Sequence, residues 1–138
     1  MQVLIVEDDF ISRRLLSRYL EAIATCDMAI NGEEALAAVR STLSSGERYN
    51  LVCLDIMMPG IDGREVLQGI RALEDEYGLA PAERCRIVMT SALDKQETQG
   101  QTTNALADDY LVKPIIKRNL MDVLDRLGLL ADDGISCS

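Results

Sequence analysis

The sequence predicts a doubly wound α/β domain, in which a five-stranded parallel sheet is covered by helices on both faces. Two patterns predict this fold class. Short, continuously apolar runs recur along the chain, as expected of strands that are buried on both faces. Between them lie longer segments with apolar residues at three- and four-residue spacing, as expected of amphipathic helices. With 138 residues the chain has the length of one domain and is too short for an eight-stranded barrel.

Five segments have the pattern of strands. Four are clear apolar runs, at residues 3–6, 51–54, 87–89 and 110–112. The fifth, CDMAI at 26–30, is weaker because it contains a charged residue. Parallel neighbours need a crossover connection, so a helix is expected between successive strands.

Four segments have clear helical spacing. Their apolar positions are Ile11, Leu15, Leu16, Tyr19, Leu20 and Ile23; Leu36, Val39 and Leu43; Val66, Leu67, Ile70 and Leu73; and Leu120, Val123, Leu124 and Leu127. Gly128 follows as a stop signal. Residues 94–105 are polar, so a helix of marginal stability is expected there, mainly because a crossover is required. Residues 74–86 are expected to form a polar loop and 131–138 a frayed tail, which leaves one domain over 1–130.

The composition excludes several classes of function. Without His, the chain can form no Ser-His-Asp centre, no Cys-His centre and no HExxH zinc site. Its 14 Lys and Arg residues against 23 Asp and Glu residues give a net charge of -9, which argues against binding nucleic acid or an anionic membrane. The four Cys residues form no CxxC pair, and neither a signal peptide nor a membrane span is apparent. These features predict a cytoplasmic protein.

The residues that directly follow the apolar runs point to phosphate chemistry. They are Glu7, Asp8 and Asp9; Asp55; Thr90 and Ser91; and Lys113 with Pro114. Ligands of open α/β sheets bind beyond the carboxyl ends of the strands, so these side chains are expected at one edge. Clustered carboxylates repel one another, and Mg²⁺ relieves this repulsion while binding phosphate oxygens. Taken singly, an acidic residue at such a position is more often a helix cap, and Asp9 fits that interpretation.

Four stretches of the sequence recur in the order and spacing of a known family. They are VLIVEDD (3–9), LVCLDIMMPGIDG (51–63), IVMTSA (87–92) and ADDYLVKP (107–114). Together they resemble the receiver domain of two-component response regulators. The resemblance implies a flavodoxin-like fold with strand order 2-1-3-4-5, two helices on one face and three on the other. It also implies that a partner histidine kinase or phosphorelay protein phosphorylates one Asp.

The resemblance also implies a phosphoacceptor and a Mg²⁺ site. Asp55 matches the phosphoacceptor, which also binds the metal. Asp8 matches a direct metal ligand and Glu7 one that acts through water. The backbone carbonyl of Met57 matches the third protein ligand. Asp9 lies one place beyond the acidic pair and is left out of the site.

Further roles in the resemblance belong to the last two strands. Lys113 matches the lysine that contacts the phosphoryl group, and the bond before Pro114 matches a cis peptide. Ser91 is the better match to the switch hydroxyl because it precedes a small residue, and Thr90 is the runner-up. Tyr110 matches the switch aromatic, expected to rotate inward as Ser91 moves, although the pattern alone also fits a buried strand aromatic.

The expected output is a contact with a downstream protein. Phosphorylation is expected to change the surface formed by 94–105, 110–112 and 117–127, whose mixed charge permits either a monomer or a phosphorylation-dependent dimer. A phosphatase of the haloacid-dehalogenase type is disfavoured because Met57 stands where that family needs a second Asp. A receiver that only binds partners is disfavoured by the intact site residues. The chain is interpreted as a stand-alone receiver, a phosphorelay intermediate or a piece of a larger regulator.

Overall fold

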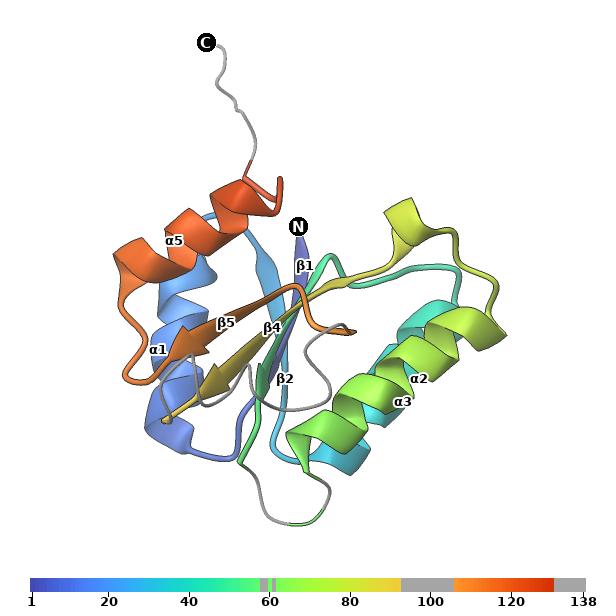
Figure 1. The fold of residues 1–138 in the computed structure, drawn as a ribbon, viewed down its shortest axis with the longest axis horizontal. Coiled ribbons are helices and arrows are strands. Elements are labelled where there is room, and N and C mark those ends of the chain that lie inside the picture. The colour runs from blue at the N-terminus through green and yellow to red at the C-terminus, as the bar shows by residue number, and fades with distance from the viewer. Residues whose placement is uncertain (58–59, 61, 93–105, 131–138) are drawn as a thin grey trace, which may run out of the picture.

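The computed structural model describes residues 1–57, 60, 62–92 and 106–130 and contains one parallel sheet (Figure 1). Its strands, in the order β2-β1-β3-β4-β5, are β1 (Gln2–Val6), β2 (Thr25–Ala29), β3 (Leu51–Asp55), β4 (Arg86–Ser91) and β5 (Asp109–Val112). The described helices are α1 (Phe10–Leu20), α2 (Gly32–Ser44), α3 (Gly63–Glu76) and α5 (Lys117–Arg126). The predicted fold class and strand order are confirmed. The helix expected over 94–105 and the tail expected over 131–138 lie outside the described residues.

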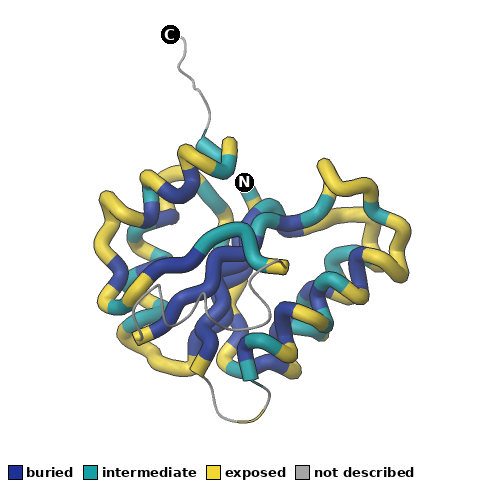
Figure 2. The backbone as a smooth tube through the Cα atoms, viewed as in Figure 1, coloured by how far each residue is buried: buried dark blue, intermediate teal, exposed yellow. Residues whose placement is uncertain are grey.

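The sheet separates two hydrophobic cores. Helices α1 and α5 cover one face and α2 and α3 the other (Figure 1). Along β3, Leu51 and Cys53 join the α1/α5 core, whereas Val52 and Leu54 join the α2/α3 core. Side chains alternate between the two faces of a strand, so a strand covered on both faces must be apolar throughout. The central strands are accordingly dark blue, that is buried, in Figure 2.

Strand β2 is the exposed edge of the sheet. It begins and ends one residue earlier than predicted, and only Ala29 in it is buried. Met28 and Ile30 are 49% and 46% exposed, because β2 pairs with β1 alone and no further strand covers it. The weak apolar pattern of this segment therefore reflects its place at the edge.

The prediction of the apolar face of α1 is wrong at two positions. Ile11 is 72% exposed, and Ile23 lies beyond the helix, which ends at Leu20. Leu16 and Leu20 form the buried face of α1. Ile11 precedes Leu16 by five residues and so lies about 140° around the helix from it, outside the buried stripe.

The polar loop expected over 74–86 is also wrong in part. Helix α3 continues to Glu76, residues 81–83 form a 3₁₀ turn, and β4 begins at Arg86. Glu74 and Cys85 are both buried. The Glu74 carboxylate contacts the Arg71 guanidinium at 2.8 Å, and this pairing makes a charged residue compatible with a buried helix position.

Candidate functional site

Strand pairing brings the predicted carboxylates together at the carboxyl edge of the sheet. Strands β1 and β3 are neighbours, with Val6 opposite Leu54, so Glu7 and Asp55 follow adjacent strand ends. Carboxylate oxygens of Glu7, Asp8 and Asp55 all lie within 4.8 Å of one another. Glu7 and Asp55 are buried, whereas Asp8 is exposed and open to a ligand from solvent. The predicted acidic cluster is therefore present.

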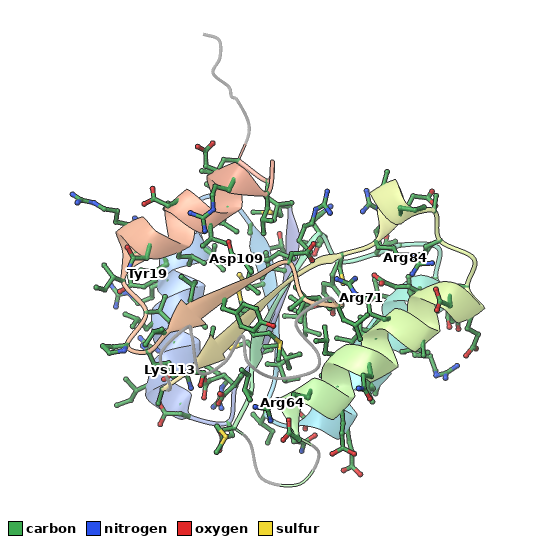
Figure 3. All side chains as sticks on the ribbon, in the orientation of Figure 1. Tyr19, Arg64, Arg71, Arg84, Asp109 and Lys113 are labelled. Atoms are coloured by element: carbon green, nitrogen blue, oxygen red, sulfur yellow. The ribbon has the colours of Figure 1, made fainter. Side chains whose placement is uncertain are left out.

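Lys113 reaches this cluster from the end of β5. Its Nζ lies 2.7 Å from Oε1 of Glu7 and 3.1 Å from Oδ2 of Asp55. The backbone N–H of Lys113 donates to the carbonyl oxygen of Ser91 at 2.7 Å. The peptide bond between Lys113 and Pro114 is cis, as the resemblance implied. Figure 3 labels Lys113 at this end of the sheet. The lysine thus contacts both buried carboxylates of the cluster.

The electrostatics of the cluster show that one lysine does not balance it. Burial raises the pKa of Glu7 to about 7, Lys113 opposes this rise, and the nearby charge of Asp55 adds to it. Burial alone would lower the pKa of Lys113, but contacts with Glu7 and Asp55 outweigh it and raise that pKa. A divalent cation fits such an excess of buried negative charge, and carboxylate oxygens are the ligands that Mg²⁺ prefers. Asp8 and Asp55, with Glu7 behind them, are the residues that would hold it.

Asp55 is fixed by the chain that follows it. The Met57 N–H donates to Oδ1 of Asp55 at 3.1 Å, and the Gly63 N–H donates to the carbonyl oxygen of Ile56 at 3.1 Å. A Cβ atom at Gly63 would collide with the carbonyl oxygen of Asp55 and lie 2.7 Å from Cα of Ile56. Sequence reasoning missed Gly63, although an Asp-Gly pair before an apolar helical segment was a usable signal. The absence of a side chain lets α3 begin against the end of β3.

The two hydroxyl residues of β4 are both buried but belong to opposite faces. Alternation along the strand places Ser91 on the face of Met89 and Tyr110, and Thr90 on the opposite face. Thr90 is paired in register with Asp55. The shared face of Ser91 and Tyr110 favours Ser91 as the hydroxyl that acts together with the aromatic ring.

Tyr110 is already buried in this structure. Its side chain is 8% exposed and packs in the α2/α3 core, and burial raises the pKa of its hydroxyl. The expectation that this ring rotates inward from a more exposed position therefore needs modification: its strand position already directs it into the core.

Asp9, which caps α1, and Arg13 within α1 make further contacts at the acidic end of β1. Asp9 caps the helix by accepting the Ser12 N–H at 2.9 Å, and this bond lowers the pKa of Asp9, as its interpretation as a cap required. Nη1 of Arg13 donates to the backbone carbonyl oxygens of Glu7 and Asp8, both at 3.0 Å. Sequence reasoning missed Arg13, because nothing in the sequence distinguishes it from any other arginine on the exposed face of a helix.

Comparison with known proteins agrees with this fold. A model of the response regulator receiver domain family matches residues 3–125. The chain belongs to this family. Receiver domains act in two-component systems as phosphoacceptors that interact with histidine kinases and phosphotransfer proteins. Among the helices that the structure describes, none has the length and apolar character needed to span a membrane.

Relatives of this receiver domain include regulators and kinases. It is 37% identical over 121 residues to the transcriptional regulatory protein ResD of Bacillus subtilis, a match that covers 87% of this chain and 45% of that protein. It is 33% identical over 128 residues to the hybrid signal transduction histidine kinase L of Dictyostelium discoideum, covering 92% of this chain and 7% of that protein. The chain thus spans less than half the length of each of these two relatives.

Solved receiver structures have the same fold. The receiver domain of the histidine kinase CKI1 from Arabidopsis thaliana, complexed with Mg²⁺ and BeF₃⁻, matches with a TM-score of 0.78 and 27% identity, over 92% of this chain and 89% of that chain. The response regulator TrrA from Thermotoga maritima, in complex with Mg²⁺ and BeF, matches with a TM-score of 0.72 and 33% identity, over 91% and 97%.

Proposed function

We propose that this receiver accepts a phosphoryl group on Asp55, in a Mg²⁺-dependent reaction, from a histidine kinase or phosphotransfer protein. The observation that carries the proposal is the contact of Lys113 Nζ with Asp55 at 3.1 Å, inside a cluster of three carboxylates. The pairing of a buried nucleophilic carboxylate with a fixed ammonium group is suited to a transferred phosphoryl group.

The proposed chemistry is a displacement at phosphorus. A carboxylate oxygen of Asp55 forms a bond to phosphorus while the bond to the donor's nitrogen or oxygen breaks, and the leaving group keeps the electron pair. The product is an acyl phosphate. Bound Mg²⁺ would supply charge neutralisation for the phosphoryl oxygens. Because the chain contains no His, a phosphohistidine donor must be another molecule.

Lys113 and Ser91 have separate roles in this proposal. Lys113 already contacts Asp55 and pairs with one phosphoryl oxygen once Asp55 carries the group. Ser91 donates a hydrogen bond to another oxygen, with Thr90 as the alternative hydroxyl. Since the Tyr110 ring is already buried, its part is to repack against the moved Ser91. Among the described residues, the affected surface comprises β5 and α5, and it signals to a protein partner or a second copy.

A protein donor is supported by the surface beside the site. Phe10 and Ile11, the first residues of α1, are 62% and 72% exposed directly after the acidic loop. A groove next to them is lined by Arg13, Arg14 and Arg18. Exposed apolar side chains with adjoining positive charge are suited to a protein surface of complementary character.

Incubation with a small acyl phosphate and Mg²⁺, followed by mass measurement, tests the proposal. We expect one adduct of roughly 80 Da, one phosphoryl group, on the wild type. The adduct should be absent from Asp55→Asn, because an amide cannot form the acyl phosphate, and absent when EDTA removes Mg²⁺.

The matched control is Asp62→Asn at the cap of α3, since Asn caps a helix as well as Asp. This variant should take up the phosphoryl group like the wild type. Continuous consumption of the donor without an adduct would indicate a phosphatase. An adduct that persists in Asp55→Asn, or a wild type that never forms one, contradicts the proposal.

A further inference from the structure

The site depends on two loops that come from distant strands. The acidic loop, residues 7–9, follows β1, and the lysine loop, residues 113–116, follows β5 at the edge of the sheet. Strands β3 and β4 separate β1 from β5. Nζ of Lys113 nevertheless lies 2.7 Å from Glu7. The paired strands relate the two loops to each other, and contacts from outside the sheet can fix them further.

Arg13 of α1 holds the acidic loop. Its Nη1 donates to the carbonyl oxygens of both Glu7 and Asp8 at 3.0 Å, and its guanidinium lies 5.7 Å from the centre of the Phe10 ring. One side chain thus fixes the backbone of two consecutive acidic residues. The orientation of both carboxylates depends on that backbone.

Tyr19 of the same helix holds the lysine loop. Its hydroxyl donates to the carbonyl oxygen of Ile115 at 3.1 Å, across 96 positions of sequence. Ile115 is buried, and the Tyr19 ring packs against the same α1/α5 core. On its other side, the loop is tied to β4 by the bond from the Lys113 N–H to the Ser91 carbonyl oxygen. In Figure 3, Tyr19 lies on the side of the molecule where β5 ends, above Lys113.

We propose that α1 is the common anchor of the phosphoacceptor site, with Arg13 positioning the acidic loop and Tyr19 positioning Lys113. The inference rests on the proposed function: the two side chains position the groups that would bind Mg²⁺ and the phosphoryl group. Neither contacts the carboxylate of Asp55 in a described hydrogen bond or ion pair, so both are positioning residues. The two loops then differ in what they control: the acidic loop controls metal binding, and the lysine loop controls transfer of the phosphoryl group.

Two conservative variants separate these tasks. Arg13→Lys keeps the positive charge, but a shorter side chain with a compact ammonium cannot hold both carbonyl groups. We expect the Kd for Mg²⁺ to rise about three- to tenfold, the effect of one lost hydrogen bond, while the transfer rate at saturating Mg²⁺ stays within about twofold. Tyr19→Phe removes one oxygen atom and keeps the ring. We expect the reverse: an unchanged Kd and a transfer rate about three- to tenfold lower.

The measurements are a Mg²⁺ titration followed by NMR, the rate of adduct formation from a small acyl phosphate, and the side-chain NH₃⁺ signal of Lys113. That signal should move further in Tyr19→Phe than in Arg13→Lys, where it senses only the change at Glu7, 2.7 Å from Nζ. The matched controls are Arg40→Lys, an exposed arginine on α2 that pairs with Glu76 at 3.2 Å, and Tyr77→Phe, whose hydroxyl pairs with the exposed Ser44 at 2.7 Å. Both should match the wild type in all three measurements.

Two results would overturn the inference. In one, both variants match their controls. In the other, both variants melt at a lower temperature, but Arg13→Lys does not change mainly the Kd for Mg²⁺ and Tyr19→Phe does not change mainly the transfer rate. Failure of the proposed function looks different. A wild type that binds Mg²⁺ but never forms the adduct refutes phosphorylation. The Kd of Arg13→Lys and the Lys113 signal of Tyr19→Phe then still decide whether α1 positions the loops.

Discussion

At the residue scale, Glu7 carries the charge that the fold accommodates least well. It is 1% exposed and has Asp55 as a neighbour, so its ionised form lacks water and meets a second negative charge. Lys113 offsets only part of this cost, because it also contacts Asp55. A cation bound beside Glu7 would stabilise its ionised form. The same cost makes the stability of the metal-free protein depend on pH.

We therefore predict that the metal-free protein loses stability as the pH rises through the pKa of Glu7. Folding raises this pKa from 4.5 to about 7, so between these values the folded state holds a proton that the unfolded state has lost. The stabilisation is complete below pH 4.5 and is gone above about pH 7. Glu7→Gln should remove this dependence. Urea unfolding in EDTA at a series of pH values measures it.

The control for this experiment is Glu47→Gln, a substitution in an exposed loop, which should keep the dependence of the wild type. Added Mg²⁺ should flatten the wild-type curve, because a bound cation favours ionised Glu7. Identical slopes for the wild type and Glu7→Gln would refute this account of the site.

At the scale of the element, helix α3 and strand β3 together hold Asp55, the proposed phosphoacceptor. Gly63 begins α3 and donates to the carbonyl oxygen of Ile56, directly after Asp55. The strand was predictable because four consecutive apolar residues are required where both faces are covered. The contact between the start of α3 and the end of β3 was not predictable from the sequence, because it depends on how closely two separate backbones approach each other. Packing also explains why Ile11 was wrongly placed in the core. Periodicity predicts that a helix has an apolar face, but packing against the sheet decides which residues of that face are buried.

Gly63→Ala is predicted to abolish adduct formation and to lower the free energy of unfolding by about 3 kcal/mol, the upper end of the usual cost of overpacking. The added Cβ meets backbone atoms of Asp55 and Ile56, which cannot move without shifting the Asp55 carboxylate. Gly69→Ala is the matched control in the same helix. Its Cβ meets only the end of the flexible Leu36 side chain, at 2.8 Å, so a change within about 1 kcal/mol is expected. Urea unfolding and the mass assay test both, and equal effects of the two substitutions would contradict this interpretation.

At the scale of the whole molecule, Arg71 connects elements at the end of the sheet opposite the site. It contacts Glu74 within α3 at 2.8 Å and Asp108, which precedes β5, at 3.0 Å. It also donates to the carbonyl oxygens of Leu106 at 3.0 Å and Cys85 at 2.9 Å. Figure 3 shows Arg71 between α3 and the starts of β4 and β5. The fold class and the acidic cluster at the edge of the sheet could be predicted from local patterns. This network could not, because its partners lie up to 37 positions apart.

The position of Arg71 predicts a large loss of stability when its charge is removed. Arg71→Met keeps most of the apolar stem but leaves the carboxylate of Glu74, 2% exposed, without its counter-charge. Breaking a buried pair in this way lowers the free energy of unfolding by about 3 to 5 kcal/mol. The matched control is Arg40→Met, which breaks the pair with Glu76 at 3.2 Å. Both of those side chains are more than half exposed, so the expected loss is below about 1 kcal/mol.

Urea unfolding of the two variants measures this difference directly. Glu74→Gln adds a third point. The Arg71 guanidinium and the Cys85 N–H donate to different oxygens of Glu74, both at 2.8 Å, and Gln keeps one oxygen, so it loses the charge and one of these two hydrogen bonds. Its loss should fall between those of the two Arg variants, since one hydrogen bond survives and Arg71 keeps Asp108 as a counter-charge. Equal losses for Arg71→Met and Arg40→Met would mean that burial does not determine the strength of these pairs. The network would then not be what joins α3 to β4 and β5.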